Sequence, residues 1–278
     1  MQKTCPSCGE IFFTDRSAKQ YCSRQCANRA TGAKRVEQYD RGDVKTVWSC
    51  GGGVQSTAIA AAIETGVLPK PDFGIMVDCG FERAETMEYV RGVIAERMKR
   101  CGVHFEIIPS SKYVDVDIVT EDGHVNIPAF RLKEDGSISK LSTHCNGTWK
   151  VKVSRTWMHE HGIESVDNWI GISTDEARRM STSPKKWISY KYPLIDLGWN
   201  RDRCIFEIQK AGWPKPRRTS CCFCPQQDEE AWLHLFKDCP EDWKRAVAVD
   251  EILAKKAPDV FLLRSCVRLK EMEPIFNR

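Results

Sequence analysis

The sequence lacks long apolar runs, export features and repeats. No stretch approaches the ~18 apolar residues of a membrane-spanning helix, and nothing at the N-terminus reads as a signal peptide. No internal repeat or low-complexity tract is present, which excludes solenoid and fibrous architectures. We therefore expect a cytoplasmic protein with no membrane anchor.

The chain also lacks a large excess of either charge. Its 278 residues carry a formal net charge of +4, which permits nucleic-acid binding but does not argue for it. Hydrophobic residues make up 41% of the chain and charged residues 29%, which is ordinary for a globular protein. A chain of this length can bury one substantial core and carry a small appendage.

Cysteine, by contrast, is abundant, with 14 residues in the chain. Disulfide frameworks belong mainly to exported proteins. Cysteines at this density in a chain without an export signal point instead to metal, cluster or redox chemistry in a reducing compartment. They divide into two groups and several isolated residues.

The first cysteine group lies within the first 26 residues and has the spacing C-x2-C-x13-C-x3-C. Two close pairs of thiolates separated by such a loop can close a tetrahedral zinc site, and so small a module depends on its metal for stability. Basic residues in and after the module allow a nucleic-acid contact, with a solvated basic face as the alternative. The predicted zinc ligands are Cys5, Cys8, Cys22 and Cys26.

The second cysteine group is a C-x2-C pair, Cys221 and Cys224, to which we add the isolated Cys145. Three thiolates on a 4Fe-4S cluster would leave one iron free to bind substrate or sulfide. Two alternatives are a redox-active thiol pair and a zinc site completed by His144 or Cys222.

A glycine-rich loop stands between a predicted strand at 44–48 and a predicted Ala-rich helix at 56–64. Glycines at such a turn let backbone N–H groups converge on an anion, and the positive end of the helix favours the same charge. A tight turn without a ligand is the alternative. No Gly-Lys-Ser/Thr follows the glycines, so this is not a Walker A loop. The predicted phosphate-binding residues are Gly51, Gly52, Gly53, Gln55, Ser56 and Thr57.

The alternation of elements after the loop predicts an α/β fold with a doubly wound, mostly parallel sheet. A buried strand at 73–79 contains Asp78 near its end, and an amphipathic helix at 82–100 and a strand at 103–108 follow. Ligands on such sheets bind beyond the carboxyl ends of the strands, where the loop and Asp78 both fall.

A further strand at 166–173 runs into a polar segment at 171–180. The arginines of this segment could bind phosphate, and its carboxylates could hold Mg²⁺. A capped start of an exposed helix is the alternative. The candidate residues are Asp175, Glu176, Arg178 and Arg179.

The expected domain organisation has four parts. Residues 1–30 form the zinc finger, and 31–43 form a polar linker. Residues 44–200 form the nucleotide-binding α/β domain, in which 110–142 is an excursion or lid. Residues 201–278 form a helical region that carries the C-x2-C pair.

Six features occur together in the region 44–270. They are the loop 51–57, Asp78, Cys145, Gly-Ile-Ser-x-Asp-Glu-x-x-Arg-Met at 171–180, Tyr-Pro-Leu-Ile at 192–195, and Ser-Cys-x-x-Cys-Pro at 220–225. In combination they resemble the phosphoadenylylsulfate (PAPS) reductase-like proteins of bacteria and their phages. Those proteins belong to the pyrophosphate-loop (PP-loop) superfamily and have the adenine nucleotide alpha hydrolase-like fold. The predicted zinc finger is an addition outside the resemblance.

The resemblance implies an ATP-dependent enzyme that forms AMP and pyrophosphate, with sulfur transfer as the favoured reaction. ATP and Mg²⁺ would bind on the loop, an acceptor oxygen would attack the α-phosphate, and sulfide would displace AMP. Asp78 and Asp175 are implied to position magnesium or the acceptor. Relatives modify sulfonucleotides, tRNA or DNA, so a nucleic acid and a sulfur donor are the expected partners. The sequence does not predict the oligomeric state.

Two other functions stay open. A sulfonucleotide reductase would bind PAPS on the loop and attack its sulfur with a thiolate, but Cys266 lacks the usual Glu-Cys-Gly-x-His context. A non-enzymatic nucleic-acid-binding protein would use the fold only as a scaffold. Gln55 at a position where the superfamily often has Asp, and Cys50 before the loop, are consistent with a loss of hydrolysis.

Overall fold

The structure, a computed structural model, describes residues 1–7, 9–23, 26–27, 30, 41–142 and 145–277. Two compact units make up the chain. Residues 31–40 of the predicted linker lie outside the described residues, and the predicted domain boundaries stay predictions. The first unit comprises Met1–Met76, Tyr89–Glu106 and Met158–Arg217, and the second comprises Val77–Glu88, Ile107–Trp157 and Arg218–Arg278.

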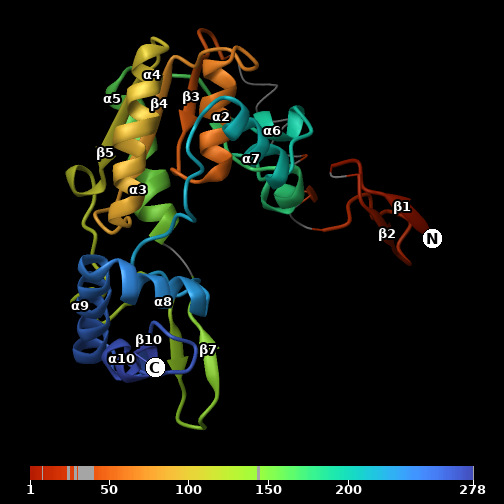
Figure 1. Cartoon of the computed structure of the whole chain (residues 1–278). Helices are drawn as coiled ribbons and strands as arrows, with labels where there is room; N and C mark the ends of the chain where they lie inside the picture. Colours follow the sequence, from red (N-terminus) through yellow and green to blue (C-terminus); the bar gives the residue numbers. More distant parts are fainter. Residues whose placement is uncertain (8, 24–25, 28–29, 31–40, 143–144, 278) are drawn as a thin grey trace. The chain divides into compact units, whose positions relative to one another are not determined.

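A five-stranded sheet forms the centre of the α/β fold (Figure 1). Its strands are β3 (Lys45–Ser49), β4 (Phe73–Asp78), β5 (His104–Pro109), β8 (Val166–Ile170) and β9 (Ile188–Lys191). The strand order is β5-β4-β3-β8-β9. β3 pairs in parallel with both β4 and β8, and β8 pairs in parallel with β9. The predicted α/β class with a mostly parallel sheet is therefore confirmed.

Helices flank the sheet. α2 (Val54–Glu64) directly follows the glycine loop, and its residues from Ser56 to Ile63 are all buried. Its run of alanines lets α2 pack closely against α7 (Arg201–Lys210). A further helix, α5, spans Lys152–Glu160. Within the described residues, no helix combines the length and apolar character needed to span a membrane.

The helix predicted at 82–100 is present as three consecutive pieces. These are α3 (Ala84–Tyr89), the π-helix η1 (Val90–Ala95) and α4 (Glu96–Arg100). The side chains predicted to form its apolar face are buried, and they are Met87, Val90, Ile94 and Met98. Amphipathic spacing therefore located both the helix and its buried face.

The N-terminal residues form a small hairpin, labelled β1 and β2 in Figure 1. β1 (Gln2–Thr4) pairs antiparallel with β2 (Ile11–Phe13). Phe12 packs with Cys5 and Cys26 in a small buried cluster. So small a core depends on a further constraint such as a metal, in agreement with the sequence analysis.

The second unit combines a small sheet with helices. Its sheet has the order β10-β6-β7 and joins β6 (Phe130–Leu132), β7 (Ile138–Lys140) and β10 (Val260–Phe261). The predicted excursion at 110–142 thus contains a hairpin that pairs with a strand near the C-terminus. Within it, Arg131 forms an ion pair with Asp259 at 2.8 Å.

The helices of the second unit enclose an aromatic core. Trp232 and Trp243 stack edge to face, and Phe236 and Phe276 pack against Trp243. The helices are η2 (Ser110–Lys112), η3 (Asn146–Val151), α8 (Glu229–Asp238), α9 (Pro240–Lys256) and α10 (Leu269–Phe276). α8, α9 and α10 lie in the region 201–278, which the sequence predicts to be helical.

Gly74 in β4 lies where two aromatic rings leave no space for a side chain. A Cβ there would lie 2.7 Å from Cδ2 of Phe105 and 3.0 Å from Cε3 of Trp48. We expect Gly74→Ala to lower the free energy of unfolding by about 1–3 kcal/mol, because rigid rings would have to shift. Denaturant unfolding measures the change.

Gly92→Ala in η1 is the matched control, since a Cβ there meets nothing within 4 Å. Alanine in a helix should raise the free energy of unfolding by about 0.4–1 kcal/mol. Equal stabilities for the two variants would contradict the tight packing at Gly74.

Candidate active site

The glycine loop leads from β3 into the first turn of α2, as the sequence predicts. Gly52 has φ +71°, a left-handed conformation that a side chain would strain. The N–H of Gly51 donates a hydrogen bond to Oγ of Ser56 at 2.9 Å, so the helix side chain folds back onto the loop. Gly53 is the N-cap of α2. The first N–H groups of a helix have no carbonyl partner within it, which makes this turn a natural anion site.

The loop lies at the topological switch point of the sheet. The chain runs outward from β3 through β4 to β5 and then returns to β8 on the other side of β3. In open α/β sheets, ligands bind beyond the strand ends at this reversal. Gly171, just after β8, closes against α2, because a Cβ on it would lie 3.2 Å from the backbone N of Ser56. The residues that follow β3 and β8 therefore form the two sides of one candidate site.

Gln55 links the loop to the polar segment at 171–180. Its Nε2 donates to Oε2 of Glu176 at 3.0 Å and to Oγ of Ser173 at 3.3 Å. Arg201 Nη1 donates to Oε1 of Gln55 at 3.4 Å. The amide thus satisfies an acceptor and a donor at once, which a carboxylate at this position could not do. This arrangement gives the departure from the usual Asp a structural role.

The predicted catalytic residues Asp175, Glu176 and Arg179 lie on the 3₁₀ helix η4 (Thr174–Arg179). Arg179 Nη1 donates to Oε1 of Glu176 at 2.7 Å, and the backbone N–H of Arg201 donates to Asp175 at 3.1 Å. The hydroxyl of Ser173 holds the pKa of Asp175 below its ordinary value. In the described part of the chain, neither carboxylate joins a group of three convergent metal ligands. Mg²⁺ usually takes much of its coordination from substrate phosphates.

Cys50 and Thr57, at the two ends of the loop motif, are both buried. Thr57 is fully buried and Ser56 is 8% exposed, so Ser56 is the better placed hydroxyl. Burial raises the pKa of Cys50 to about 12. A raised pKa favours the neutral thiol, and its Sγ accepts the N–H of Gly52 at 3.4 Å within the loop.

Asp78, the predicted residue at the end of β4, belongs to the second unit. Its Oδ1 accepts the N–H of Gly80 at 2.8 Å and closes the turn that follows the strand. Gly80 has φ +80°, which this turn requires. Within its own unit Asp78 therefore has a turn-closing role, and the predicted magnesium role stays a prediction.

The second unit contains a thiol centre that the sequence located only in part. Sγ of Cys79 lies 3.7 Å from Sγ of Cys221, and these two thiols converge with the carboxylate of Glu82. Cys79 was not among the predicted ligands. Its position directly after Asp78, at the carboxyl end of a strand, is the signal that could have found it.

A buried ion pair adjoins this thiol pair. Nζ of Lys150 donates to Oε1 of Glu82, whose side chain is only 2% exposed. Burial disfavours the ammonium, but the charges of Glu82, Cys221 and Cys79 outweigh it and raise the pKa of Lys150. The hydrogen bond between the thiols lowers the pKa of Cys79, and the charge of Lys150 acts in the same direction. The same hydrogen bond raises the pKa of Cys221, and burial acts in the same direction. The fixed cation therefore lies beside one thiol, Cys79, that is favoured as a thiolate, and one, Cys221, that is not.

The structure does not bring the other two predicted thiols into this group: in the described residues, neither Cys145 nor Cys224 belongs to a set of three convergent ligands. Burial raises the pKa of Cys145, and the charge of Cys224 acts in the same direction. The charge of Lys150 acts on both. Cys222, considered as an alternative ligand, is fully buried in the hydrophobic core. The other alternative ligand, His144, lies outside the described residues.

Three of the four predicted zinc-finger ligands converge. The sulfur atoms of Cys5, Cys22 and Cys26 all lie within 4.8 Å of one another, with Cys22 and Cys26 at 3.5 Å. Two thiolates on one tetrahedral zinc would be roughly 3.8 Å apart. The fourth predicted ligand, Cys8, lies outside the described residues.

Comparison with solved structures gives likenesses of low sequence identity. The U34-tRNA thiolase NcsA from Methanococcus maripaludis, with its 4Fe-4S cluster, is 14% identical and has a TM-score of 0.44; the match covers 99% of this chain and 87% of that chain. The PAPS reductase from Candida auris, in complex with phosphate, is 14% identical and has a TM-score of 0.40, covering 66% and 81%. No protein-family model and no curated protein matches the sequence.

The contact of Gly171 with α2 gives a direct test of the candidate site. In Gly171→Val, the Cβ would meet the backbone of Gln55 and Ser56 at 3.2–3.3 Å and displace the first helical turn. We expect ATP to bind at least about tenfold more weakly, because the N–H groups would no longer converge. Isothermal titration calorimetry with ATP and Mg²⁺ measures the change.

Gly92→Ala again serves as the control and should bind ATP like the wild type. A Gly171→Val protein that is folded by circular dichroism and binds ATP normally would exclude this loop as the nucleotide site.

Proposed function

We propose that the chain is an ATP-dependent sulfurtransferase that acts on a nucleic acid or nucleotide and forms AMP and pyrophosphate. The observation that most supports the proposal is the thiol centre of the second unit. There, the thiols of Cys79 and Cys221 lie 3.7 Å apart and converge with Glu82, which pairs with Lys150. A nucleotide-binding loop and a centre of this kind suit a reaction in which activation precedes sulfur delivery.

The activation step would use the glycine loop. The N–H groups of Gly51 to Gln55 and the hydroxyl of Ser56 would bind the pyrophosphate of ATP, in place of the internal bond between Gly51 and Ser56. Attack of an acceptor oxygen on the α-phosphate would convert a poor leaving group into a good one. Positioning and charge neutralisation supply most of the rate in such phosphate chemistry.

The carboxylates have proposed roles in the same step. Asp175 would position Mg²⁺ or the acceptor, and Glu176 would keep Gln55 oriented through the amide contact at 3.0 Å. Arg179 would supply positive charge to the phosphates once released from Glu176. Its side chain is 67% exposed, so it is free to change partner at low cost.

The sulfur step would use the thiol centre. The donor set fits an iron–sulfur cluster, because thiolates are its usual ligands, and Cys145, Cys221 and Cys224 would hold it. A cluster with three protein ligands supplies an open iron at which sulfide can bind. Lys150 would offset the negative charge of the thiolates, and Cys79 adds a fourth thiol beside Cys221.

The proposed substrate is a nucleic acid, either DNA or tRNA, with an external sulfur donor. Basic residues of the N-terminal module, such as Lys19, would contact its phosphates. In the described residues, Lys19 Nζ also lies 5.4 Å from the ring centre of Phe12. Zinc held by the finger would fix these basic residues in place.

The sulfonucleotide-reductase alternative requires a reactive thiolate near the C-terminus. Cys266 is the only cysteine after residue 239, and burial raises its pKa above the ordinary value. Cys266 also lacks the Glu-Cys-Gly-x-His context that such reductases usually have, which favours the sulfurtransferase.

Ser56→Ala tests the activation step. Loss of a hydrogen bond to a charged phosphate costs about 1.5–3 kcal/mol, so AMP formation should fall roughly 10–100-fold. Release of AMP and pyrophosphate measures this step, and mass spectrometry of digested nucleic acid detects thiolated nucleosides. Ser137→Ala, on the exposed β6–β7 turn, is the control. It should leave AMP release and the yield of thiolated nucleosides unchanged. Normal AMP formation by Ser56→Ala would contradict the assigned loop.

Cys221→Ser tests the thiol centre. Wild-type protein purified without oxygen should contain about four irons and four acid-labile sulfides per chain, with a visible absorption band. Cys221→Ser should lose most of both, because a hydroxyl is a poor substitute for a thiolate ligand. Cys101→Ser, at the end of α4, is the matched control. Wild-type protein without iron after anaerobic reconstitution would refute the cluster and leave the activation step to be judged separately.

A further inference from the structure

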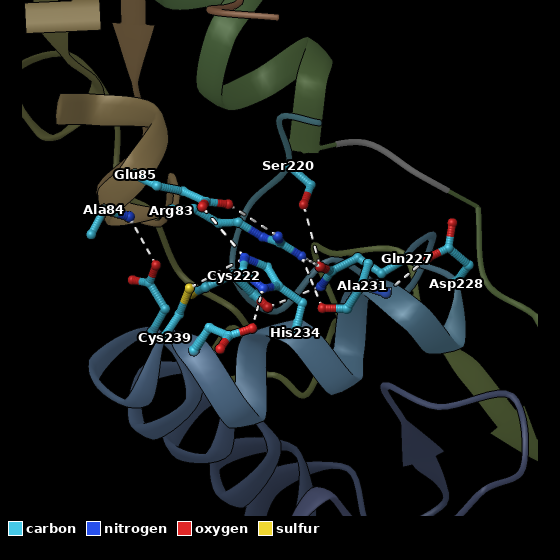
Figure 2. Close-up of polar contacts among 12 residues, drawn as sticks. Arg83, Ala84, Glu85, Ser220, Cys222, Gln227, Asp228, Ala231, His234 and Cys239 are labelled. Carbon is cyan, nitrogen blue, oxygen red and sulfur yellow. Dashed lines mark hydrogen bonds and ion pairs between the residues drawn. The ribbon is translucent and has the colours of Figure 1, made fainter. Parts of the chain in front are cut away.

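A second group of metal-ligating side chains lies in the second unit, apart from the residues assigned to the thiol centre. It consists of Glu85 on the first turn of α3, His234 on α8, and Cys239 at the corner between α8 and α9 (Figure 2). One ligand atom from each residue lies within 4.8 Å of the others. The group therefore combines a carboxylate, an imidazole and a thiol, which together suit a transition metal.

The distances match those around a tetrahedral zinc ion. With zinc–sulfur and zinc–nitrogen bonds of about 2.3 and 2.05 Å, a thiolate and an imidazole on one zinc lie roughly 3.6 Å apart. Sγ of Cys239 lies 3.7 Å from Nε2 of His234. An imidazole and a carboxylate on the same ion lie roughly 3.4 Å apart, and Oε2 of Glu85 lies 3.4 Å from Nε2 of His234.

The surroundings of His234 fit a metal ligand. Its Nδ1 lies 2.7 Å from Oδ2 of Asp238, one helical turn further on, so this carboxylate can fix the ring. Nε2 then points toward the carboxylate of Glu85 and the thiol of Cys239, as Figure 2 shows. A carboxylate bonded to the other ring nitrogen is the usual partner of a metal-bound histidine.

The carboxylate of Glu85 is also held in position. Its other oxygen, Oε1, lies 3.4 Å from Nη1 of Arg83, whose side chain is 4% exposed. The backbone carbonyl of Ala231 accepts from Nη2 of Arg83 at 3.3 Å, and Gln227 also accepts from Nη2. The arginine is thereby fixed against α8 and directs Oε2 of Glu85 toward His234 (Figure 2). Glu85 and His234 thus each have an orienting partner.

We infer that Glu85 Oε2, His234 Nε2 and Cys239 Sγ form a zinc site with three protein ligands and a fourth position for solvent. The site would join the start of α3 to the corner between α8 and α9. It would add to the bond from the Ala84 N–H to Asp242 at 2.8 Å, which already links these elements. This inference does not depend on the proposed function, because none of its ligands belongs to the loop or the thiol centre.

Zinc content of the full-length protein tests the site. His234→Ala and Cys239→Ser should each contain about one zinc per chain less than the wild-type protein. His124→Ala, an exposed histidine, and Cys101→Ser are the matched controls and should keep the wild-type content. Zinc bound by the finger is common to all variants and cancels from the comparison. Wild-type zinc content in both His234→Ala and Cys239→Ser would overturn the inference.

Asp238→Asn gives a test that loss of folding cannot imitate, because the side chain is 65% exposed. Removing the carboxylate behind a metal-bound histidine weakens metal binding about 10–100-fold. Competition with a zinc chelator should show this weakening at one site only. Cobalt substitution adds a spectroscopic check, since Cys239→Ser should remove the thiolate–cobalt absorption of that site. Unchanged zinc affinity in Asp238→Asn together with an unchanged cobalt spectrum in Cys239→Ser would also overturn the inference.

Discussion

The close approach of α2 to the residue after β8 is the constraint on which the nucleotide-binding half depends. β3 and β8 pair in register up to Ser49 and Ile170, so the chain leaves both strands at the same edge. α2 begins almost immediately after β3, and a Cβ at position 171 would lie 3.2–3.3 Å from Ser56 and Gln55 in its first turn. The small residues of α2 allow it to lie deep against its neighbours. Anion binding at its N-terminus is therefore a consequence of packing as much as of the loop itself.

In the second unit, buried charges fix the register of the segment 79–85. Residues 82 and 221 form an antiparallel bridge, and the N–H of Cys222 donates to the carbonyl of Phe81. Arg245 donates to the carbonyl of Glu82 at 3.1 Å and pairs with Asp242 at 2.6 Å. An unpaired charge in such a site is costly, so each pairing excludes alternative registers of this segment.

Much of the fold followed from the sequence because its signals were local. Apolar strands and one long amphipathic helix predicted the α/β class and the parallel sheet. β9 was missed because Ile188–Lys191 is only four residues long and its strand character comes from pairing with β8. The β6–β7 hairpin was missed as well, since it is completed by a strand more than 100 residues later in the chain.

The candidate site residues were predictable where they are contiguous in the sequence, and not where they come from distant segments. The loop residues are contiguous, so their spacing alone placed them at a helix start. Cys79 and the group of Glu85, His234 and Cys239 come from distant segments, and no spacing rule connects them. The loop and the segment at 171–180 were each predicted as candidate binding residues. The bonds of Gln55 to Glu176 and Arg201, which join the two, arise only on folding.

The segment 79–85 supplies residues both to the thiol centre and to the inferred zinc site of the second unit. Cys79 and Glu82 converge with Cys221, whereas Glu85 converges with Cys239. Glu85 has different partners from Glu82 because α3 begins at Ala84 and turns Glu85 away from the extended residues that precede it. A shift in this segment would therefore disturb both groups together. The pairing of residues 82 and 221 and the bond from Ala84 to Asp242 oppose such a shift from two sides, which makes this segment the structural link between them.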